Sequence, residues 1–249
     1  MIELSFAFDI NNMVKQAISS YLAVLEVSPN YADVHFKLAN AYEAEGQIGK
    51  AISEYQKAIG INPSYVDAHR KLGELYSDEG LAEQAIEEFK TVLSIKVKHR
   101  YADVYNNLGV AHEKAKKYAK AITAYKKAID INPKYARAHF NLGNAYLTKG
   151  SYEEAVAEYK LSLQSNLKNA QCFNNLGIAL ANINNLGDAE KAFHEAIVIQ
   201  PDYARAHHNL ANVYYDMGET GKAVSEYKKA LEIDPEDTES AKILEKLTK

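Results

Sequence analysis

Residues 136–169 read ARAHFNLGNAYLTKGSYEEAVAEYKLSLQSNLKN, and this stretch of 34 residues decides the fold. Apolar residues recur three and four positions apart in its first half, at Ala138, Leu142, Ala145 and Tyr146. They recur in the same way in its second half, at Ala155, Val156, Tyr159 and Leu163. Each half therefore predicts one amphipathic helix. Gly150 between them favours the left-handed backbone that ends a helix and reverses the chain, so the stretch predicts a helical hairpin.

The same pattern repeats along the whole chain with a period of 34 residues. The prolines follow this period, apart from one insertion of two residues between the second and third: Pro29, Pro63, Pro133, Pro201 and Pro235. A Leu followed by a small residue keeps the same phase: Leu4, Leu38, Leu72, Leu108, Leu142, Leu176 and Leu210. An Ala follows each of these leucines after thirteen residues, and an aromatic residue follows that Ala after four. The predicted repeats are 1–31, 32–65, 66–101, 102–135, 136–169, 170–203 and 204–237.

The small residues explain how the two helices of a hairpin meet. The residue after each Leu, and the Ala that opens each second helix, have almost no side chain, so two helices can approach closely there. The aromatic residue then fills the space beside them. One hairpin cannot bury its apolar face alone, so neighbouring hairpins are expected to stack into a continuous solenoid.

The Leu-Gly, Tyr, Ala, aromatic and Pro pattern at this period resembles the tetratricopeptide repeat family. The resemblance implies an all-α, right-handed superhelical solenoid whose first helices line a concave side. Departures are few: His112 and Leu180 replace the first-helix Tyr in two repeats, and Val97 and Leu167 replace the Pro in two others. We expect softer joints at the two missing prolines. Histidines stand at the usual Trp position in four repeats: His35, His69, His139 and His207.

The two ends of the array differ. Residues 238–249 predict a C-terminal capping helix whose inward side chains are Ala241, Leu244 and Leu247. At the other end, Leu4, Ser5 and Phe8 occupy the Leu, small and Tyr positions, so the first repeat is incomplete and begins within its first helix. We therefore expect an uncovered apolar face at Ala17, Ile18 and Tyr21. Either the chain is a fragment of a longer array, or this open end meets a partner.

Composition excludes several classes of function. The single Cys172 allows neither a disulfide within the chain nor a cysteine metal site. No secretion signal and no apolar run of about 18 residues occurs, so we expect a soluble, cytoplasmic protein. No phosphate loop or nucleophile motif is present, and we expect no enzyme activity, cofactor or metal. The four histidines at the Trp position, called the slot histidines below, are about one hairpin apart, which is too far to share a metal ion. We therefore expect them to pack or hydrogen-bond.

Charge is distributed unevenly. The net charge is −4, but residues 1–95 carry 7 basic and 14 acidic side chains, whereas residues 96–134 carry 10 basic and 3 acidic side chains. The basic band 96–134 contains a dense group of cations: Lys96, Lys98, His99, Arg100, Lys114, Lys116, Lys117, Lys120, Lys126 and Lys127. No aromatic ladder accompanies it, so nucleic acid is disfavoured. We expect an acidic protein surface or a second copy of the chain there, and contact with an anionic membrane surface is the open alternative.

The resemblance also indicates the ligand-facing positions. The residue before each Leu faces the concave side in this family, and here the series is Lys37, Lys71, Asn107, Asn141, Asn175 and Asn209. The asparagines resemble the ladder in the repeat domain of O-linked N-acetylglucosamine transferase. An Asn amide offers donors and an acceptor, so it can pair with a peptide backbone whatever the ligand side chains are. We expect these amides to be unnecessary for stacking. Around them lies a mixture suited to an acidic or carboxylate group: Arg137, Arg205, Phe140, His208, Asn144 and Asn212.

The predicted function is therefore a non-catalytic scaffold that binds an extended peptide segment of a partner protein. Two alternatives remain open: a self-assembling structural scaffold, and the substrate-recognition domain of a larger enzyme. Binding of heat-shock chaperone tails is disfavoured, because the repeats that clamp such tails carry a Lys four residues before an Asn. Here that position holds Phe36, Phe140 or His208.

Overall fold

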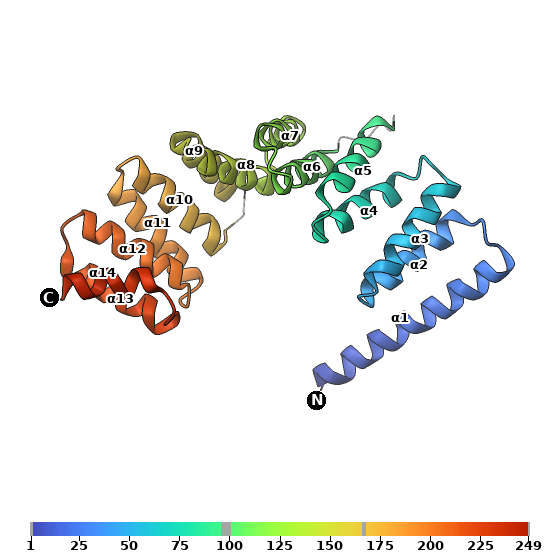
Figure 1. Cartoon of the computed structure of the whole chain (residues 1–249), viewed down its shortest axis with the longest axis horizontal. Helices are drawn as coiled ribbons and strands as arrows, with labels where there is room; N and C mark the ends of the chain where they lie inside the picture. The colour runs from blue at the N-terminus through green and yellow to red at the C-terminus, as the bar shows by residue number, and fades with distance from the viewer. Residues whose placement is uncertain (1, 96–100, 166–167, 249) are drawn as a thin grey trace. The chain divides into compact units, whose positions relative to one another are not determined.

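In this computed structural model the described residues are 2–95, 101–165 and 168–248, and side chains are described from residue 12 onward. These residues form α-helices joined by short turns (Figure 1). The helices are α1 (Ile2–Val27), α2 (Ala32–Ala44), α3 (Ile48–Ile61), α4 (Val66–Asp78), α5 (Ala82–Ser94), α6 (Ala102–Lys114), α7 (Tyr118–Ile131), α8 (Ala136–Lys149), α9 (Tyr152–Gln164), α10 (Ala170–Asn182), α11 (Leu186–Ile199), α12 (Ala204–Asp216), α13 (Thr220–Ile233) and α14 (Thr238–Leu247). The expected joints at Val97 and Leu167 lie outside the described residues.

The helices group into two compact units, residues 1–121 and residues 122–249, called unit 1 and unit 2 below. Unit 1 contains α1 to α6, unit 2 contains α8 to α14, and α7 crosses the boundary. Within each unit, α2 packs on α3, α4 on α5, α8 on α9, α10 on α11 and α12 on α13. Each hairpin also packs on the next one in its unit, for example α9 on α10 and α11 on α12. The predicted all-α solenoid of helical hairpins is confirmed. No helix among the described residues is long and apolar enough to cross a membrane.

Close approach inside each hairpin depends on the small residues, as predicted. A Cβ added at Gly177 would lie 2.6 Å from the Phe193 ring, and one at Gly143 would lie 2.8 Å from the Tyr159 ring. Both rings are almost fully buried. The aromatic ring of the second helix therefore lies directly against the backbone of the first, and this contact sets how closely the two helices approach.

The turns inside the hairpins use left-handed backbone, also as predicted. Gly46, Gly80, Gly150 and Gly218 have φ between 75° and 80°. In the remaining two hairpins the same position holds Lys116, at φ 58°, and Asn184, at φ 59°. A lysine is strained in this region of backbone space, and an asparagine less so.

The four slot histidines each join the two helices of their own repeat to the end of the preceding repeat. In the last repeat, Nδ1 of His207 lies 2.6 Å from the Glu226 carboxylate on the second helix, and Nε2 donates to the Pro201 carbonyl at 3.1 Å. The same pair of contacts, called the His–Glu clamp below, recurs at His35 with Glu54 and Pro29, at His69 with Glu88 and Pro63, and at His139 with Glu158 and Pro133. The predicted hydrogen-bonding role of these histidines is confirmed. Among the described side chains no group of three metal-ligand residues comes together.

Repeats 102–135 and 170–203 lack the clamp, and several positions change there as a set. The slot histidine becomes Tyr105 or Phe173, and the glutamate becomes Ala124 or Ala192. The same two repeats carry the turn residues Lys116 and Asn184 in place of Gly, and a buried asparagine follows the slot, at Asn106 and Asn174. The array therefore contains two kinds of repeat, clamped and unclamped.

The first repeat is not a hairpin, and here the prediction was wrong. Residues 2–27 form one continuous helix, α1, which runs through the position where the other repeats turn. A turn there would interrupt main-chain hydrogen bonds, and the short preceding segment has little surface to bury in return. Ile18 is buried and Tyr21 is half-buried, so the expectation that this face lies uncovered was also wrong. The side chains of Leu4 and Phe8 lie outside those described.

The C-terminal helix α14 packs on α13, as expected of a capping helix. Asp237 caps its N-terminus by accepting hydrogen bonds from the backbone N–H groups of Glu239 and Ser240. Leu244 and Leu247 pack on the core of unit 2, together with Ile243. Ala241 is exposed rather than inward.

Candidate functional site

The first helices of unit 2 carry a connected chain of asparagine amides. The Asn175 amide nitrogen donates to the Asn144 oxygen at 2.9 Å, which joins α10 to α8. The Asn209 amide nitrogen donates to the Asn174 oxygen at 2.9 Å, which joins α12 to α10. Asn174 in turn donates to Asn175 at 3.2 Å. The amide chain, Asn144–Asn175–Asn174–Asn209, therefore runs across three consecutive first helices.

The amide chain keeps hydrogen-bonding capacity for a ligand. Asn175 and Asn209 are half-buried, and each uses one amide hydrogen in these contacts. An Asn side chain can donate two hydrogen bonds and accept two, so each amide retains one N–H and at least one lone pair. Their positions are fixed by the protein's own contacts, which lowers the entropy lost on binding.

Two arginines stand in the first turns of α8 and α12 beside the amide chain. Arg137 and Arg205 are exposed, and neither makes an ion pair with any described residue. A cation at a helix N-terminus opposes the helix dipole and costs about 0.3–1 kcal/mol. In unit 1, the equivalent first-turn residues are acidic, at Asp33, Asp67 and Asp103, as the dipole favours. The face of the first helices that carries the amide chain is called the amide face below. The arginines thus add positive charge to this face at some cost in helix stability.

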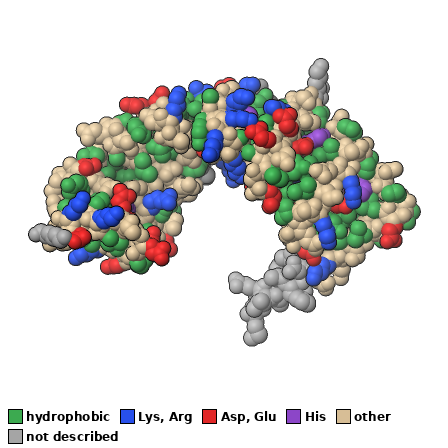
Figure 2. Space-filling view, viewed as in Figure 1, with side chains coloured by type: hydrophobic (Ala, Val, Ile, Leu, Met, Phe, Trp, Pro, Cys, Tyr) green, Lys and Arg blue, Asp and Glu red, His purple; other side chains and the backbone are tan. Residues whose placement is uncertain are grey.

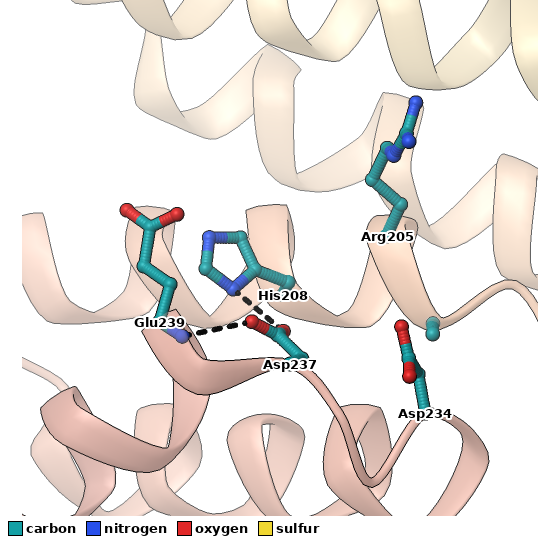
Figure 3. A pocket seen from close by; sticks show the side chains of 6 residues that line it. Arg205, His208, Asp234, Asp237 and Glu239 are labelled. Atoms are coloured by element: carbon teal, nitrogen blue, oxygen red, sulfur yellow. Dashed lines mark hydrogen bonds and ion pairs between the residues drawn. The ribbon is translucent and has the colours of Figure 1, made fainter.

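A small cavity of about 240 Å³ opens at the C-terminal end of this face, between α12, the turn after α13 and the start of α14. It is lined by Ala204, Arg205, His208, Asp234, Asp237 and Glu239 (Figure 3). Nδ1 of His208 lies 2.7 Å from the Ser240 hydroxyl and 3.3 Å from the Asp237 carboxylate. The Arg205 side chain points away from this pair (Figure 3). Its guanidinium is therefore available to a ligand.

The Asp237 carboxylate is held ionised at this end. Burial by itself raises the pKa of Asp237, but hydrogen bonds from Ser240 and the charge of His208 outweigh it and lower that pKa. His208 also meets the Tyr227 ring edge-on, with ring centroids 5.8 Å apart. His208 is thus fixed between α14 and the core of unit 2.

Comparison with known repeat families agrees with this architecture. A family model described as TPR repeat matches residues 11–46, 40–80, 114–150 and 183–218. Models described as tetratricopeptide repeat match residues 204–237, 66–99 and 136–169. Together these matches cover most of the chain. The chain belongs to the tetratricopeptide repeat family. Repeats of this family build scaffolds for protein–protein interaction. No curated protein matches this sequence.

Several solved tetratricopeptide structures share the fold at low sequence identity. The chain is similar to a chain of the APC/C hetero-tetramer Cut9–Hcn1, with a TM-score of 0.71 and 18% identity. That match covers 95% of this chain but only 46% of the other. PilF of Pseudomonas aeruginosa matches with a TM-score of 0.72 and 22% identity, and the match covers 86% of this chain and 97% of PilF. YrrB is described as a TPR protein with an unusual peptide-binding site. It matches with a TM-score of 0.63 and 23% identity, and the match covers 76% of this chain and 96% of YrrB. At these identities the comparison supports the fold alone.

The expectation that the ladder amides are unnecessary for stacking was wrong. Asn175 and Asn209 each hydrogen-bond to the preceding tetratricopeptide repeat, so they help to hold neighbouring hairpins together. Asn144 and Asn212 accept hydrogen bonds from the buried hydroxyls of Tyr159 and Tyr227. Phe140 packs on the Tyr159 ring, with ring centroids 6.1 Å apart. The predicted site residues thus have structural contacts as well.

Sequence reasoning missed Asn174, the buried link of the amide chain. The signal was present, because two asparagines stand directly before the repeat Leu-Gly only at residues 106–109 and 174–177. The contributions of Asp237 and Ser240 were also missed, because they come from the capping helix and lie about 30 residues after His208.

Three of the remaining predicted positions, Lys37, Lys71 and Asn107, lie on the first helices of unit 1. Asn107 donates to Glu74 at 3.3 Å, and Lys71 pairs with Glu43 at 3.2 Å. Lys37 is exposed. Asn141 lies in unit 2 at the expected position on α8 and is half-buried. The predicted ladder is therefore divided. In unit 1, Asn107 and Lys71 are each paired with an acid, whereas in unit 2 Asn175 and Asn209 belong to the amide chain.

The described part of the basic band is partly neutralised within the protein. Lys and Arg side chains stand at the surface around α7 (Figure 2). Lys117 pairs with Glu83 at 2.7 Å, Lys114 donates to the Ser77 carbonyl, and Lys126 lies 5.7 Å from the Tyr146 ring centroid. Burial, followed by the charges of the nearby lysines, lowers the pKa of His112. His112 therefore adds no charge to the band at neutral pH. Lys96, Lys98, His99 and Arg100 lie outside the described residues.

Proposed function

We propose that this protein is a non-catalytic scaffold whose unit 2 binds an extended segment of a partner protein along the first helices α8, α10 and α12. The amide chain is the observation that carries the proposal. It presents partly satisfied, pre-positioned amides on three consecutive repeats, and such groups pair with peptide N–H and C=O groups independently of ligand sequence.

The spacing of the repeats suits an extended ligand. Packed helices lie about 10 Å apart, and an extended strand rises about 3.3 Å per residue. One amide therefore meets roughly every third ligand residue. The side chains between these contacts are free to face the helices at other positions, where they can add specificity.

The charge of the face indicates an acidic segment. Arg137 and Arg205 flank the amide chain without intramolecular ion pairs among the described residues. A guanidinium binds a carboxylate through two parallel hydrogen bonds, so acidic side chains or a terminal carboxylate are the groups that these arginines fit. Asp234, Asp237 and Glu239 line the cavity beside Arg205. An acidic ligand therefore approaches Arg205 from the side to which its guanidinium points (Figure 3).

We expect the double variant Asn175→Ala, Asn209→Ala to weaken ligand binding by about 2 kcal/mol, or roughly thirtyfold in Kd, at about 1 kcal/mol per lost hydrogen bond. Peptides selected from a display library on the unmodified chain provide the ligands, and fluorescence anisotropy measures their affinity. Acidic sequences are expected to dominate the selection.

Because the same amides join neighbouring repeats, the double variant is also expected to melt at a lower temperature, so binding is measured where both forms are folded. Ser162→Ala is the matched control, since it removes a buried hydrogen bond to the Ala136 carbonyl from the second helix α9. This control is expected to lose stability but to keep its affinity. Equal affinity of the double variant and the unmodified chain would contradict the proposal.

A second candidate function is self-assembly through the N-terminal helix. Met13, Val24 and Val27 are exposed by 69%, 42% and 85%, and their spacing places them on one face of α1. An exposed apolar strip is suited to pairing with a second copy. The charge of −7 over residues 1–95 and of +7 over residues 96–134 can add attraction between copies.

If α1 pairs between copies, the chain should sediment as a dimer or larger species, and Met13→Glu, Val24→Glu should shift it to the monomer. An apolar contact persists at 1 M salt, where the Debye length is about 3 Å, whereas a contact between charge bands weakens. A control, Leu161→Glu, adds a charge at an exposed apolar residue of α9. A chain that is monomeric at every concentration and salt level excludes self-assembly.

A further inference from the structure

A second hollow, of about 300 Å³, lies in unit 2 between the second helices α9 and α11 and the first helix α10. Its floor is apolar, formed by Phe173, Leu176, Leu180 and Ala192, and its rim carries Lys160, Asp188, Lys191 and Glu195. The α10 residues of the floor and Asn175 lie on different faces of that helix, given its rotation of about 100° per residue. The hollow is therefore separate from the amide face.

Two substitutions in the unclamped repeat explain why space is present here. Leu180 lies four residues after the repeat leucine, where Tyr76, Tyr146 and Tyr214 stand in clamped repeats. Ala192 stands where those repeats place the clamp glutamate, for example Glu226. Both changes replace a longer side chain by a shorter one. The hollow therefore lies where the clamped repeats carry a tyrosine ring and a carboxylate.

In the clamped repeats, polar groups on neighbouring helices hold this tyrosine. Gln56 donates to the Tyr76 hydroxyl at 2.8 Å, and the Lys126 ammonium lies 5.7 Å from the Tyr146 ring centroid. The Tyr214 hydroxyl donates to Glu190 at 2.9 Å and lies 3.0 Å from Nε2 of His194. Gln56, Lys126 and His194 each directly follow the core aromatic residue of the preceding second helix.

Lys160 is the equivalent residue beside Leu180, because it directly follows Tyr159. It is exposed and makes no hydrogen bond or ion pair with the described residues. Asp188 and Glu195 provide carboxylate acceptors at the same rim. The Asp188 carboxylate also forms an ion pair with the Lys191 ammonium at 2.9 Å. The hollow thus retains the polar partner of a phenol but lacks the phenol.

We infer that this hollow binds a tyrosine side chain supplied by a partner protein, which takes the place of the missing first-helix tyrosine. Its ring covers the apolar floor, the Lys160 ammonium donates to the phenol oxygen, and the phenol hydrogen is directed to a rim carboxylate. The volume is at the lower end of ligand pockets and is suited to one side chain rather than to a larger molecule.

The test uses the full chain with N-acetyl-tyrosine amide, its phenylalanine counterpart and its leucine counterpart as probes. Titrations followed by ¹H–¹⁵N NMR are expected to show saturable shifts at Leu180 and Ala192, with a Kd for the tyrosine probe on the order of 1 mM. The phenylalanine probe is expected to bind about fivefold more weakly, because it lacks the hydroxyl. The leucine probe is expected to bind more weakly still.

Three variants separate the contributions. Leu180→Tyr restores the residue of the clamped repeats and is expected to abolish binding of all three probes. Ala192→Val, which fills the hollow from α11, is a second blocking variant in case the first disturbs folding. Lys160→Met is expected to remove the preference for tyrosine over phenylalanine while the apolar part of binding stays.

Lys126→Met is the matched control, since the equivalent space beside Lys126 is filled by Tyr146, and this variant is expected to bind as the unmodified chain does. Undiminished binding to both blocking variants would overturn the inference. So would shifts that do not saturate, or equal affinity for the leucine and tyrosine probes.

Discussion

Phe193→Ala is expected to lower the stability of unit 2 by about 3–5 kcal/mol, the usual cost of removing a buried phenyl ring. The Phe193 ring is 1% exposed and lies against Gly177, where even a single added carbon would be 2.6 Å from the ring. The backbone of α10 has no side chain there with which to fill the vacated space. A cavity is therefore expected to remain between α10 and α11.

Urea denaturation followed by circular dichroism measures this loss, and amide exchange locates it. Repeats contact only their neighbours, so exchange is expected to accelerate most in α10 and α11. Val198→Ala is the control on the same helix, because Val198 is 75% exposed and its truncation should change stability little. A loss below about 1 kcal/mol for Phe193→Ala would mean that the ring contact does not define the hairpin.

His207→Leu should destabilise unit 2 by about 3 kcal/mol, near the lower end for breaking a buried ionisable pair. The change removes the bonds to Glu226 and to the Pro201 carbonyl and leaves both acceptors buried or partly buried. Lys229 still pairs with Glu226 at 2.7 Å, which keeps the cost from being larger. Thermal and urea denaturation measure the difference.

The unclamped repeat 170–203 provides the control, because it combines Phe173 with Ala192 at the two clamp positions. The double variant His207→Phe, Glu226→Ala copies that combination and should recover most of the stability lost by His207→Leu. Failure to recover would show that the carboxylate is not what makes the single variant unstable.

The clamp also links stability to pH. Burial raises the pKa of Glu226, but bonds from Lys229 and His207 outweigh it and hold that pKa below its ordinary value of 4.5. A carboxylate with a depressed folded-state pKa stabilises the fold fully above pH 4.5 and loses this contribution as pH falls through the lower folded value. The double variant lacks Glu226 and should therefore show a smaller loss of stability over that acidic range.

The periodic pattern of the sequence was sufficient to predict the helical hairpins, their turns and the capping helix. These features depend on contacts between residues at fixed distances along the chain, such as Gly143 with Tyr159. The turn glycines, Gly150 among them, were predictable for the same reason, since their conformation is local.

The errors arose where the outcome depends on competition or on contacts between repeats. Residues 2–27 carry the repeat leucine and the Ala–aromatic spacing, yet α1 is a single helix, because the pattern does not show how much surface a hairpin there would bury. The bond from Asn209 to Asn174 was not predicted because it joins different positions of neighbouring repeats. The hollow beside Leu180 was not predicted because it depends on how three helices leave space together.

The alternation of clamped and unclamped repeats bears on how the length of this array can change. Residues 66–135 and 136–203 each contain one clamped repeat followed by one unclamped repeat, so they form a tandem pair of two-repeat modules. Duplicating either module, or deleting residues 136–203, joins an unclamped repeat to a following clamped repeat, which is a junction that the chain already contains. Duplicating a single unclamped repeat would instead place two unclamped repeats side by side, a combination that the chain does not contain. Growth of this solenoid by a pair of hairpins therefore preserves the kinds of junction that it already has.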